Sequence, residues 1–478
     1  MAAKEKSHAA AHRAKLPSVA LSRSRVALLP LAERLAAGKA LRAKVPRKSH
    51  GDYTPAPDRR DPVAILEEQA KTRLPELVPI RYTRMLASPF AFLRGSAAVM
   101  AGDLATTPTT GLTVQACGDA HVSNFGAFAS AERNLIFGLN DFDETLPGPW
   151  EWDLKRLAAS AAVAVRFLGG DDEEAEGAAR AAVESYRKWM RRYAKMGHLD
   201  VWYSRLDERS VLPTLSPKAR RRAEKLTARA RGRTHMQVLE KITDLVDDQH
   251  RIHESRPLIV RETKTRSGRP MAEALALFIR NYLASIPDER RPLLARYRIA
   301  DVARKVVGVG SVGTRCWVLY LVGNHDEDPL FLQLKEAQPS VLEPYTAPSV
   351  YANQGQRVVV GQRLIQGAPD IFLGWGEQYG VHFYVRQLRD MKGSTDLVPG
   401  EIEIDNFTER CGGTGWALAL AHAKSGDPAM IAGYVGKSEA LDEAIGKFAM
   451  AYAEQTERDY DLLGKAARSR RIRVASER

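Results

Sequence analysis

Two short acidic runs lie close together in the first third of the chain. The run CGDAHVSN contains Asp119, His121 and Asn124, and the run NDFDE contains Asp141 and Asp143. Carboxylate and amide oxygens are the hard ligands that Mg²⁺ prefers, and an ionised aspartate can orient a hydroxyl group. In a phosphoryl transfer the protein must hold Mg²⁺ and orient the attacking hydroxyl group. We therefore interpret Asp119 as a catalytic base, Asn124 and Asp141 as metal ligands, and Asp143 as a further ligand or an exposed acid.

The two runs resemble the catalytic-loop and metal-binding signatures of the aminoglycoside and choline phosphotransferases, members of the protein-kinase-like superfamily. CGDAHVSN follows the family pattern His-Gly-Asp-x-His-x-x-Asn, except that Cys117 replaces the first histidine. NDFDETLPGPWEWDLKRLA is similar to Ile-Asp-Phe followed by Gly-x-Pro-x-x-Asp-Leu-Ala. The resemblance implies ATP and Mg²⁺ as cofactors, Asp119 as the base, Asn124 and Asp141 as metal ligands, and Asp153 as a structural acid that supports the loop.

The wider sequence is similar to an uncharacterised bacterial family, domain of unknown function 2252. The stretches SPFAFLRGSAAVM, NDFDETLPGPWEWDLKRL and YVRQLRDMKGS carry this second resemblance, which covers most of residues 60–460. It brings no established activity with it. The chemistry must therefore be argued from the phosphotransferase signatures and from the residues themselves.

The phosphate-binding motif expected of a kinase-like chain lies after the acidic runs instead of before them. The motif GVGSVG separates two apolar stretches, and glycines let successive backbone N–H groups approach phosphates. Lys335 follows within the apolar stretch LFLQLKEA and resembles the phosphate-pairing lysine of kinases; an edge-strand lysine is the alternative. The nucleotide-binding residues that we predict are Gly308, Gly310, Ser311, Gly313 and Lys335.

Some neighbouring residues have two interpretations. We interpret His121 as a residue that stabilises its loop, in preference to a metal ligand. Arg386 and Arg389, in YVRQLRD, could bind substrate or phosphate anions or pair with the acidic runs. The carboxylate partner of the strand lysine is open between Glu336 and Glu343.

Hydrophobic periodicity indicates the elements that must position these residues. We predict strands within 111–121 and 134–144, so that each acidic run follows a strand. Helices are predicted over 149–169 and 171–197, the second with acids in its first turn and bases in its last. Strands return between about 300 and 390, around a helix, and the remainder is helical.

These patterns predict an α+β chain with a two-lobed protein-kinase-like fold in circularly permuted order. Circular permutation is tolerated where the new termini fall on exposed turns. The predicted divisions are a basic, partly disordered N-terminal extension (1–60), a helical lobe with the catalytic and metal-binding loops (61–300), a β-rich nucleotide-binding lobe (301–395), a helical segment that returns to the large lobe (396–464), and a basic tail (465–478).

The net charge of +13 comes from the two ends of the 478-residue chain. Residues 1–50 hold 12 Lys and Arg and 2 Glu, and residues 465–478 hold 6 Lys and Arg and 1 Glu, so the rest carries 13 − 15 = −2. Basic ends can contact nucleic acid or an anionic membrane. These ends lack interleaved aromatic residues for base stacking, and we favour solvated tails.

Composition narrows the cellular context. We find no run of about 18 uncharged apolar residues, so no membrane span is predicted. Three scattered cysteines fit a reducing compartment without a disulfide framework, and we expect a cytoplasmic protein.

The predicted function is an ATP- and Mg²⁺-dependent phosphotransferase that acts on an unidentified acceptor hydroxyl. The same fold could instead carry nucleotidyl transfer, or bind nucleotide without catalysis. A third alternative is a metal-dependent hydrolase built on Asp119, His121, Asp141 and Asp143, which would need neither the glycine motif nor Lys335.

Overall fold

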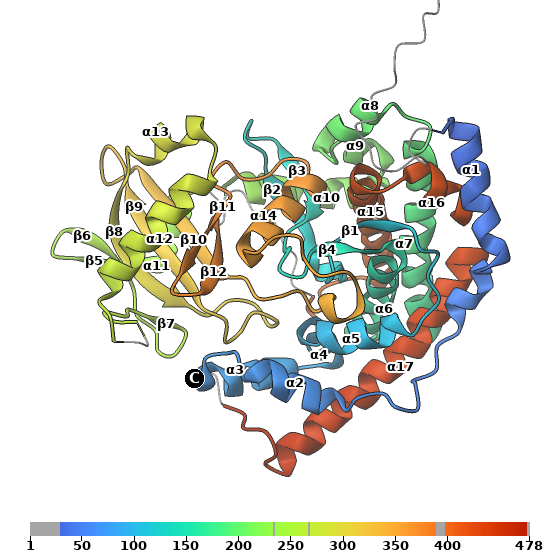
Figure 1. Cartoon of the computed structure of the whole chain (residues 1–478), viewed down its shortest axis with the longest axis horizontal. Coiled ribbons are helices and arrows are strands. Elements are labelled where there is room, and N and C mark those ends of the chain that lie inside the picture. Colours follow the sequence, from blue (N-terminus) through green and yellow to red (C-terminus); the bar gives the residue numbers. More distant parts are fainter. Residues whose placement is uncertain (1–28, 233–234, 266–267, 389–396, 476–478) are drawn as a thin grey trace, which may run out of the picture.

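The structure, a computed structural model, describes residues 29–232, 235–265, 268–388 and 397–475, and it combines helices with antiparallel strands. A six-stranded sheet lies on one side of the molecule (Figure 1). Helices α6 (Trp150–Leu168), α7 (Asp172–Tyr193) and α15 (Ile404–Ser425) lie on the other side. The predicted α+β class is confirmed.

The helical side is built around α6, which is buried along almost its whole length. Its alanines and leucines allow neighbouring helices to pack on every face, as expected for a central helix. α7 begins with a capping box between Asp171 and Glu174, which satisfies free N–H groups of its first turn. α7 packs against α15, and α17 (Ala440–Arg468) crosses α6 and α7.

Shorter helices surround this core. The helices that precede the first strand are α1 (Leu31–Ala40), α2 (Pro62–Ala70), α3 (Val78–Met85), α4 (Pro89–Gly95) and α5 (Ala97–Ala105). Those that follow α7 are α8 (His198–Tyr203), α9 (Glu208–Val211) and α10 (Pro217–Gly232), and α16 (Pro428–Val435) joins α15 to α17. α1 packs against α16.

Two small pairs of strands lie between the helical side and the six-stranded sheet (Figure 1). β1 (Thr113–Ala116) pairs with β4 (Leu146–Pro149), and β2 (Phe125–Ala129) pairs with β3 (Leu135–Leu139), all antiparallel. The first acidic run therefore leads from β1 to β2, and the second leads from β3 to β4. Sequence periodicity found β1 and β3, whereas β2 and β4 were not predicted because they are short and contain glycine or proline.

The large sheet has the strand order β11-β12-β10-β9-β8-β7. Its strands are β7 (Ile259–Val260), β8 (Arg298–Lys305), β9 (Cys316–Val322), β10 (Pro329–Glu336), β11 (Gly374–Gln378) and β12 (Val381–Gln387). β8, β9 and β10 form a meander. The chain then passes through α14 (Gln354–Ile365) and returns as the β11–β12 hairpin, whose strand β12 pairs with β10.

Both faces of the sheet are covered. Leu319 and Leu321 of β9 belong to a core with α12 (Met271–Ser285), while Val318 and Tyr320 belong to another core with α11 (His235–Ile242). This alternation follows the two-residue period of a strand. β10 lies in the interior of the sheet, between β9 and β12, and both faces of the sheet are covered there. All residues of β10 are therefore buried, including Lys335. Also present are α13 (Arg291–Leu294) and the hairpin of β5 (Thr243–Val246) with β6 (Gln249–Ile252).

Two of the predicted boundaries, at residues 301 and 465, differ from the structure. The sheet begins with β7 at Ile259, well before residue 301, because the short strands β5 to β7 give little periodic signal. Within the expected N-terminal extension, residues 1–28 lie outside the described residues, and α1 forms an ordered helix. α17 continues to Arg468, so the C-terminal tail starts inside a helix.

In the described part of the chain, none of the helices combines the length and the apolar character needed to cross a bilayer. The expectation of no membrane span agrees with this finding.

Candidate functional site

The turn that follows β1 is held by a buried aspartate. Asp153, near the start of α6, accepts hydrogen bonds from the backbone N–H of Cys117 at 2.6 Å and of Gly118 at 2.9 Å. Gly118 has a φ of +80°, and a Cβ there would lie 2.5 Å from the carbonyl oxygen of Glu144. Only glycine fits this turn without strain. Asp153 thus holds the backbone of the loop at Cys117 and Gly118.

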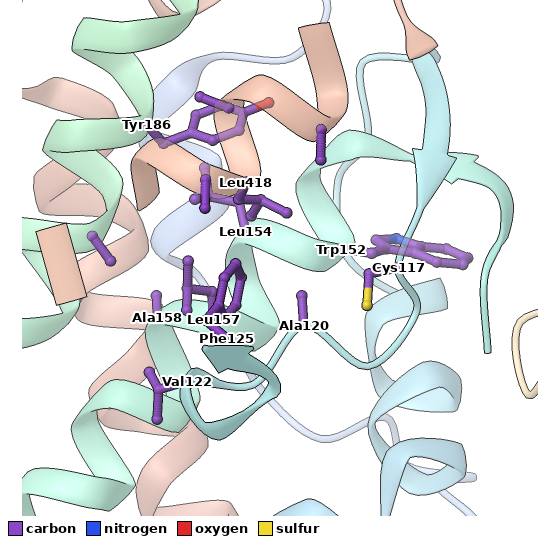
Figure 2. Close-up of a cluster of buried hydrophobic side chains, with 14 of the residues drawn as sticks. Cys117, Ala120, Val122, Phe125, Trp152, Leu154, Leu157, Ala158, Tyr186 and Leu418 are labelled. Atoms are coloured by element: carbon purple, nitrogen blue, oxygen red, sulfur yellow. The ribbon is translucent and has the colours of Figure 1, made fainter. Parts of the chain in front are cut away.

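Asp153 is itself supported from two other helices. His422 of α15 has its Nε2 atom 3.2 Å from Asp153 Oδ2, and its Nδ1 atom lies 2.9 Å from the hydroxyl of Tyr186 on α7. Val122 in the loop and Phe125 at the start of β2 belong to the same buried apolar cluster as Leu157 of α6 (Figure 2). The loop backbone is therefore anchored by hydrogen bonds at one point and by packing at another.

Asp119 lies at the tip of this loop and faces a buried arginine. Arg156 of α6 is 2% exposed, and its Nε donates to Asp119 Oδ1 at 2.6 Å. The same guanidinium donates to the carbonyl oxygen of Leu93 at 2.9 Å. The aspartate is thus held from the inside, while about a quarter of its side chain (24%) remains exposed.

His121 lies beside Asp119, with its Nε2 atom 3.8 Å from Asp119 Oδ2. Burial lowers the pKa of His121 to about 4, against a smaller opposing effect of the Asp119 charge. The imidazole is therefore neutral at pH 7. Backbone hydrogen bonds from His121 N to Asp119 O and from Asn124 N to His121 O shape the turn, in keeping with a loop-stabilising residue.

Asn124 joins the two acidic runs. Its side-chain oxygen accepts a hydrogen bond from Asp141 N at 2.8 Å, and its side-chain nitrogen donates to the carbonyl oxygens of Asp119 and Asp141, each at 3.0 Å. The amide oxygen expected to hold a metal is thus bound to the protein backbone. Asn124 acts in this structure as a bridge between the loops.

The second acidic run contacts Lys335 of β10, which lies far from it in the sequence. Lys335 is 1% exposed, and its Nζ lies 3.2 Å from both carboxylate oxygens of Asp141 and in direct contact with Asp143. Burial alone would lower the pKa of Lys335, but the charges of Asp141 and Asp143 raise it above its ordinary value. Tyr384, opposite Lys335 on β12, donates to Asp143 at 2.7 Å. The lysine therefore stays cationic between two carboxylates.

The glycine motif forms the loop between β8 and β9, next to Asp143 of the second acidic run. Gly308 and Gly313 have φ values of +66° and +92°. Ser311 donates to Asp143 Oδ2 at 3.3 Å. The helical side also holds the loop, because Arg73 donates to Val312 O at 2.5 Å. The loop is thus fixed next to Asp143 and Lys335.

These segments line one cleft of about 990 Å³. The predicted residues that line it are Asp119, His121, Asn124, Asp141, Asp143, Gly308, Gly310, Ser311, Lys335 and Arg386. Asp153 and Gly313 lie behind the surface, and Arg389 lies outside the described residues. Segments about 200 residues apart in sequence therefore share one cavity, as Lys335 and Asp141 (194 residues apart) demonstrate directly.

A family profile described as "Uncharacterized protein conserved in bacteria (DUF2252)" matches residues 73–466 of the chain. The chain belongs to the DUF2252 family. The match contains both acidic runs, the glycine motif and Lys335, so the cleft of this DUF2252 chain is built from family sequence. No curated protein matches the chain, and no solved structure matches it.

The two carboxylates considered as partners of Lys335 have other contacts in this DUF2252 chain. Glu336 pairs with Arg315 at 3.0 Å, and Glu343 accepts from Ser349 N at 3.2 Å. Neither of these two candidates is the partner, and adjacent residues of a strand point to opposite faces of the sheet, so Glu336 is turned away from the lysine. Asp141 and Asp143 take the place of both.

Among the residues that the structure describes, the hydrogen-bond partners of Arg386 are a side-chain amide and a backbone carbonyl, not a carboxylate. It donates to Gln333 Oε1 at 2.9 Å and to the carbonyl oxygen of Asn140 at 3.0 Å. It thereby joins the sheet of the DUF2252 chain to the second acidic run. Its pKa is raised, since the nearby charges, among them Asp141 and Asp143, outweigh burial.

Sequence reasoning did not single out Arg73 and Arg81, which line the cleft, or Arg156, which holds Asp119. Arg81 of α3 and Arg73, in the turn before Pro75, lie outside the motifs. Arg156 lies within the motif stretch WEWDLKRLA but was given no role, and Tyr384 was interpreted only as part of a strand. A basic residue at a buried position of a helix, such as Arg156 within LKRLAASAAVAV, was the available signal. Over the described residues of the DUF2252 chain, no group of three or more His, Cys, Asp and Glu side chains forms a metal site.

Proposed function

We propose that this DUF2252 chain is an ATP- and Mg²⁺-dependent phosphotransferase with an acceptor hydroxyl as substrate. The contact of Lys335 with Asp141 and Asp143 supports this most strongly. In protein kinases a glycine-rich loop covers the phosphates, and a lysine on the third strand and an aspartate of the metal site act on the same ATP. Here the glycine loop joins β8 to β9, and the lysine lies on β10.

The acidic pair fits Mg²⁺. Asp141 and Asp143 offer oxygen ligands that are 43% and 27% exposed, and they flank a buried ammonium that offsets their charge. Mg²⁺ is typically held by one or two carboxylates together with substrate phosphates and water. We propose these two residues as the ligands. Asn124 would be a ligand only if its amide oxygen gave up the hydrogen bond from Asp141 N.

Asp119 would orient the acceptor hydroxyl. It lines the same cleft, and Arg156 fixes one of its oxygens from behind. An ionised carboxylate is sufficient to position a hydroxyl group. The neutral His121 next to it supports the turn and adds no competing charge.

We also propose that the fold is a circularly permuted kinase-like fold. The sheet with its glycine loop follows the acidic runs in sequence, yet α15, which comes after the sheet, ends beside β1. Ser425 at the end of α15 accepts a hydrogen bond from Gln115 N at 3.1 Å. In the order sheet, α15, β1, catalytic loop, the parts would follow the succession expected of a kinase-like chain.

The proposal is tested by incubating the full chain with Mg²⁺ and ATP labelled either in the γ-phosphate or in the AMP moiety, with a panel of alcohol acceptors. We expect label from the γ-phosphate in the acceptor or in released phosphate. Asp141→Asn should reduce this turnover by about 100-fold or more and leave the fold intact by circular dichroism. Asp288→Asn, a change at an acid whose side chain is 90% exposed, is the control.

Three results would contradict the proposal. Full activity of Asp141→Asn would remove the metal assignment. Label from the AMP moiety would indicate nucleotidyl transfer. Turnover that survives Lys335→Ala would favour a metal-dependent hydrolase, which has no use for the lysine.

A further inference from the structure

One wall of the cleft carries two buried arginines that the proposed phosphoryl transfer does not use. Arg81 on α3 is 1% exposed, and Arg73, just before the helical turn at Pro75, is 9% exposed. Both line the cleft with Asp119 and the glycine loop. Neither forms an ion pair with a carboxylate in the described part of the chain.

Several donors of these arginines have no acceptor. Arg81 Nη2 donates to Gln69 Oε1 at 2.8 Å and to Gly95 O at 3.0 Å, but its Nε and Nη1 have no hydrogen-bond partner among the described residues. Arg73 Nε is likewise unpartnered there, although Nη1 donates to Val312 O. Buried polar groups are nearly always hydrogen-bonded, so these N–H groups lack an acceptor.

Among the described residues, Arg81 also has no carboxylate close enough to offset its charge. Burial lowers the pKa of Arg81 well below its ordinary value, and the neighbouring charge of Arg73 lowers it further. Burial lowers the pKa of Arg73 as well, although Glu144 and Glu336 raise it in part. A buried cation without a counter-charge is costly. An anion in the cleft would supply both the missing charge and the missing acceptors.

The arginine wall is connected to Asp119 through the end of α4. Arg81 binds the carbonyl oxygen of Gly95, and Arg156 binds the carbonyl oxygen of Leu93 while holding Asp119. A group bound by Arg81 is therefore tied to the same helix end as the proposed base. Lys335, by contrast, approaches from the sheet.

We infer that Arg73 and Arg81 bind an anionic group, a phosphate or a carboxylate, carried by the acceptor substrate. This inference rests on the proposed phosphotransferase function. Guanidinium groups suit this task because their forked N–H groups match the oxygens of phosphate and carboxylate. ATP would be held by Lys335 and the glycine loop, and the anion of the acceptor by the arginines, with Asp119 near the acceptor hydroxyl.

The test uses calorimetric titration of the full chain with inorganic phosphate or with acetate, in the presence of Mg²⁺ and a saturating non-hydrolysable ATP analogue. We expect one of the two anions to bind with a single site. Arg81→Met and Arg73→Met should each weaken this binding by about tenfold or more, because a charge-assisted hydrogen bond is lost. Lys335→Met should weaken binding of the ATP analogue and leave binding of the anion.

Matched variants separate binding from folding. Arg60→Met removes an exposed arginine paired with Glu68 and should leave anion binding unchanged. Arg81→Lys keeps the positive charge and should restore part of the affinity for the anion. Thermal unfolding verifies that each variant is folded. If Arg81→Met does not fold, the anion affinity of Arg73→Met tests the inference.

Two results would overturn the inference: neither anion binds to the wild type, or Lys335→Met removes anion binding while both arginine variants keep it. The second result would assign the anion to the nucleotide phosphates. If the anion binds through the arginines but the ATP analogue does not bind the wild type, the anion site stands and the phosphotransferase proposal fails.

Discussion

At the scale of single residues, Lys335 explains how two carboxylates can lie side by side at the floor of the cleft. Asp141 and Asp143 are close enough to share one ammonium, and like charges at such a distance repel strongly where water is scarce. The lysine cancels much of this repulsion. The same cation is therefore part of the stability of the chain as well as of the proposed chemistry.

Lys335→Met should lower the free energy of unfolding by about 1–3 kcal/mol, because both carboxylates lose their counter-charge. Added Mg²⁺ should recover part of the loss, since a divalent cation can replace the lysine between the acids. Urea denaturation with and without Mg²⁺ measures both effects.

Lys188→Met serves as the comparison, because Lys188 pairs with Glu184 on an exposed helix face. Its effect should stay below about 0.5 kcal/mol and should not depend on Mg²⁺. Equal effects of the two variants would mean that the Lys335 contacts contribute no more than a surface pair.

At the scale of elements, the two acidic runs act as one unit. Asn124 binds the backbone of both runs, Asp153 holds the first, and Gly118 allows it to pass close to Glu144 of the second. A structural change in one acidic run should therefore also displace the other run.

Gly118→Ala should destabilise the chain by about 1–3 kcal/mol and reduce turnover, because the new Cβ would meet the backbone of Glu144 in a left-handed turn. Gly111→Ala is a matched control: Gly111 has a similar φ of +77° but nothing within 4 Å of its Cβ position. The difference between the two variants in thermal and urea unfolding isolates the clash. No difference would mean that the two runs are not tightly packed together.

The elements that sequence predicted best are those with strong periodic patterns. α6, α7 and α15 have long apolar faces, and β9, β10 and β12 are rich in branched and aromatic residues, so both types could be recognised. Strands such as β2, β7 and β11 are short or contain glycine. Their positions depend on pairing with distant strands, which a local pattern does not contain.

The residues of the candidate site also differ in how well the sequence predicted them. Asp119, Asp141 and Lys335 were found because their types and neighbours form a motif, and the structure brings them into one cleft. The metal role expected of Asn124 is not matched by its hydrogen bonds, because the backbone N–H of Asp141 needed an acceptor. Arg81 was missed because a buried arginine in a helix becomes visible only when the surrounding packing is known.

At the scale of the whole molecule, part of the N-terminal charge is structural. Arg42 and Arg47 donate to the carbonyl oxygens of Tyr434 and Val435 at the end of α16, each at 2.8 Å. His50 is fully buried, and its Nε2 lies 2.7 Å from the Tyr434 hydroxyl. Residues 42–50 are thus docked on the helical side, so this part of the basic N-terminal segment is packed against the protein.

The docked segment should be sensitive to acid. Burial, with a smaller effect of Lys155, lowers the pKa of His50 from 6.5 to about 3. Between these values the unfolded chain binds the extra proton, so the stability that neutral His50 contributes is present above about pH 6.5 and is lost as the pH falls toward 3. His50→Gln should therefore lose less stability than the wild type between pH 7 and pH 4.

Tyr434→Phe is the control for this pH dependence. It removes the hydrogen bond of His50 but keeps the buried imidazole, so it should lower stability at every pH and keep the acid sensitivity. Chemical denaturation at several pH values compares the three chains. Identical pH profiles of the wild type and His50→Gln would contradict the assignment.

The C-terminal segment contacts the region of α2, since Arg471 pairs with Asp61 at 2.8 Å and with Glu67 at 2.7 Å. Glu67 and Arg471 are 404 positions apart in the sequence. On the ribosome, the segment that contains Glu67 is therefore made long before its partner, and this contact can close only after residue 471 has emerged.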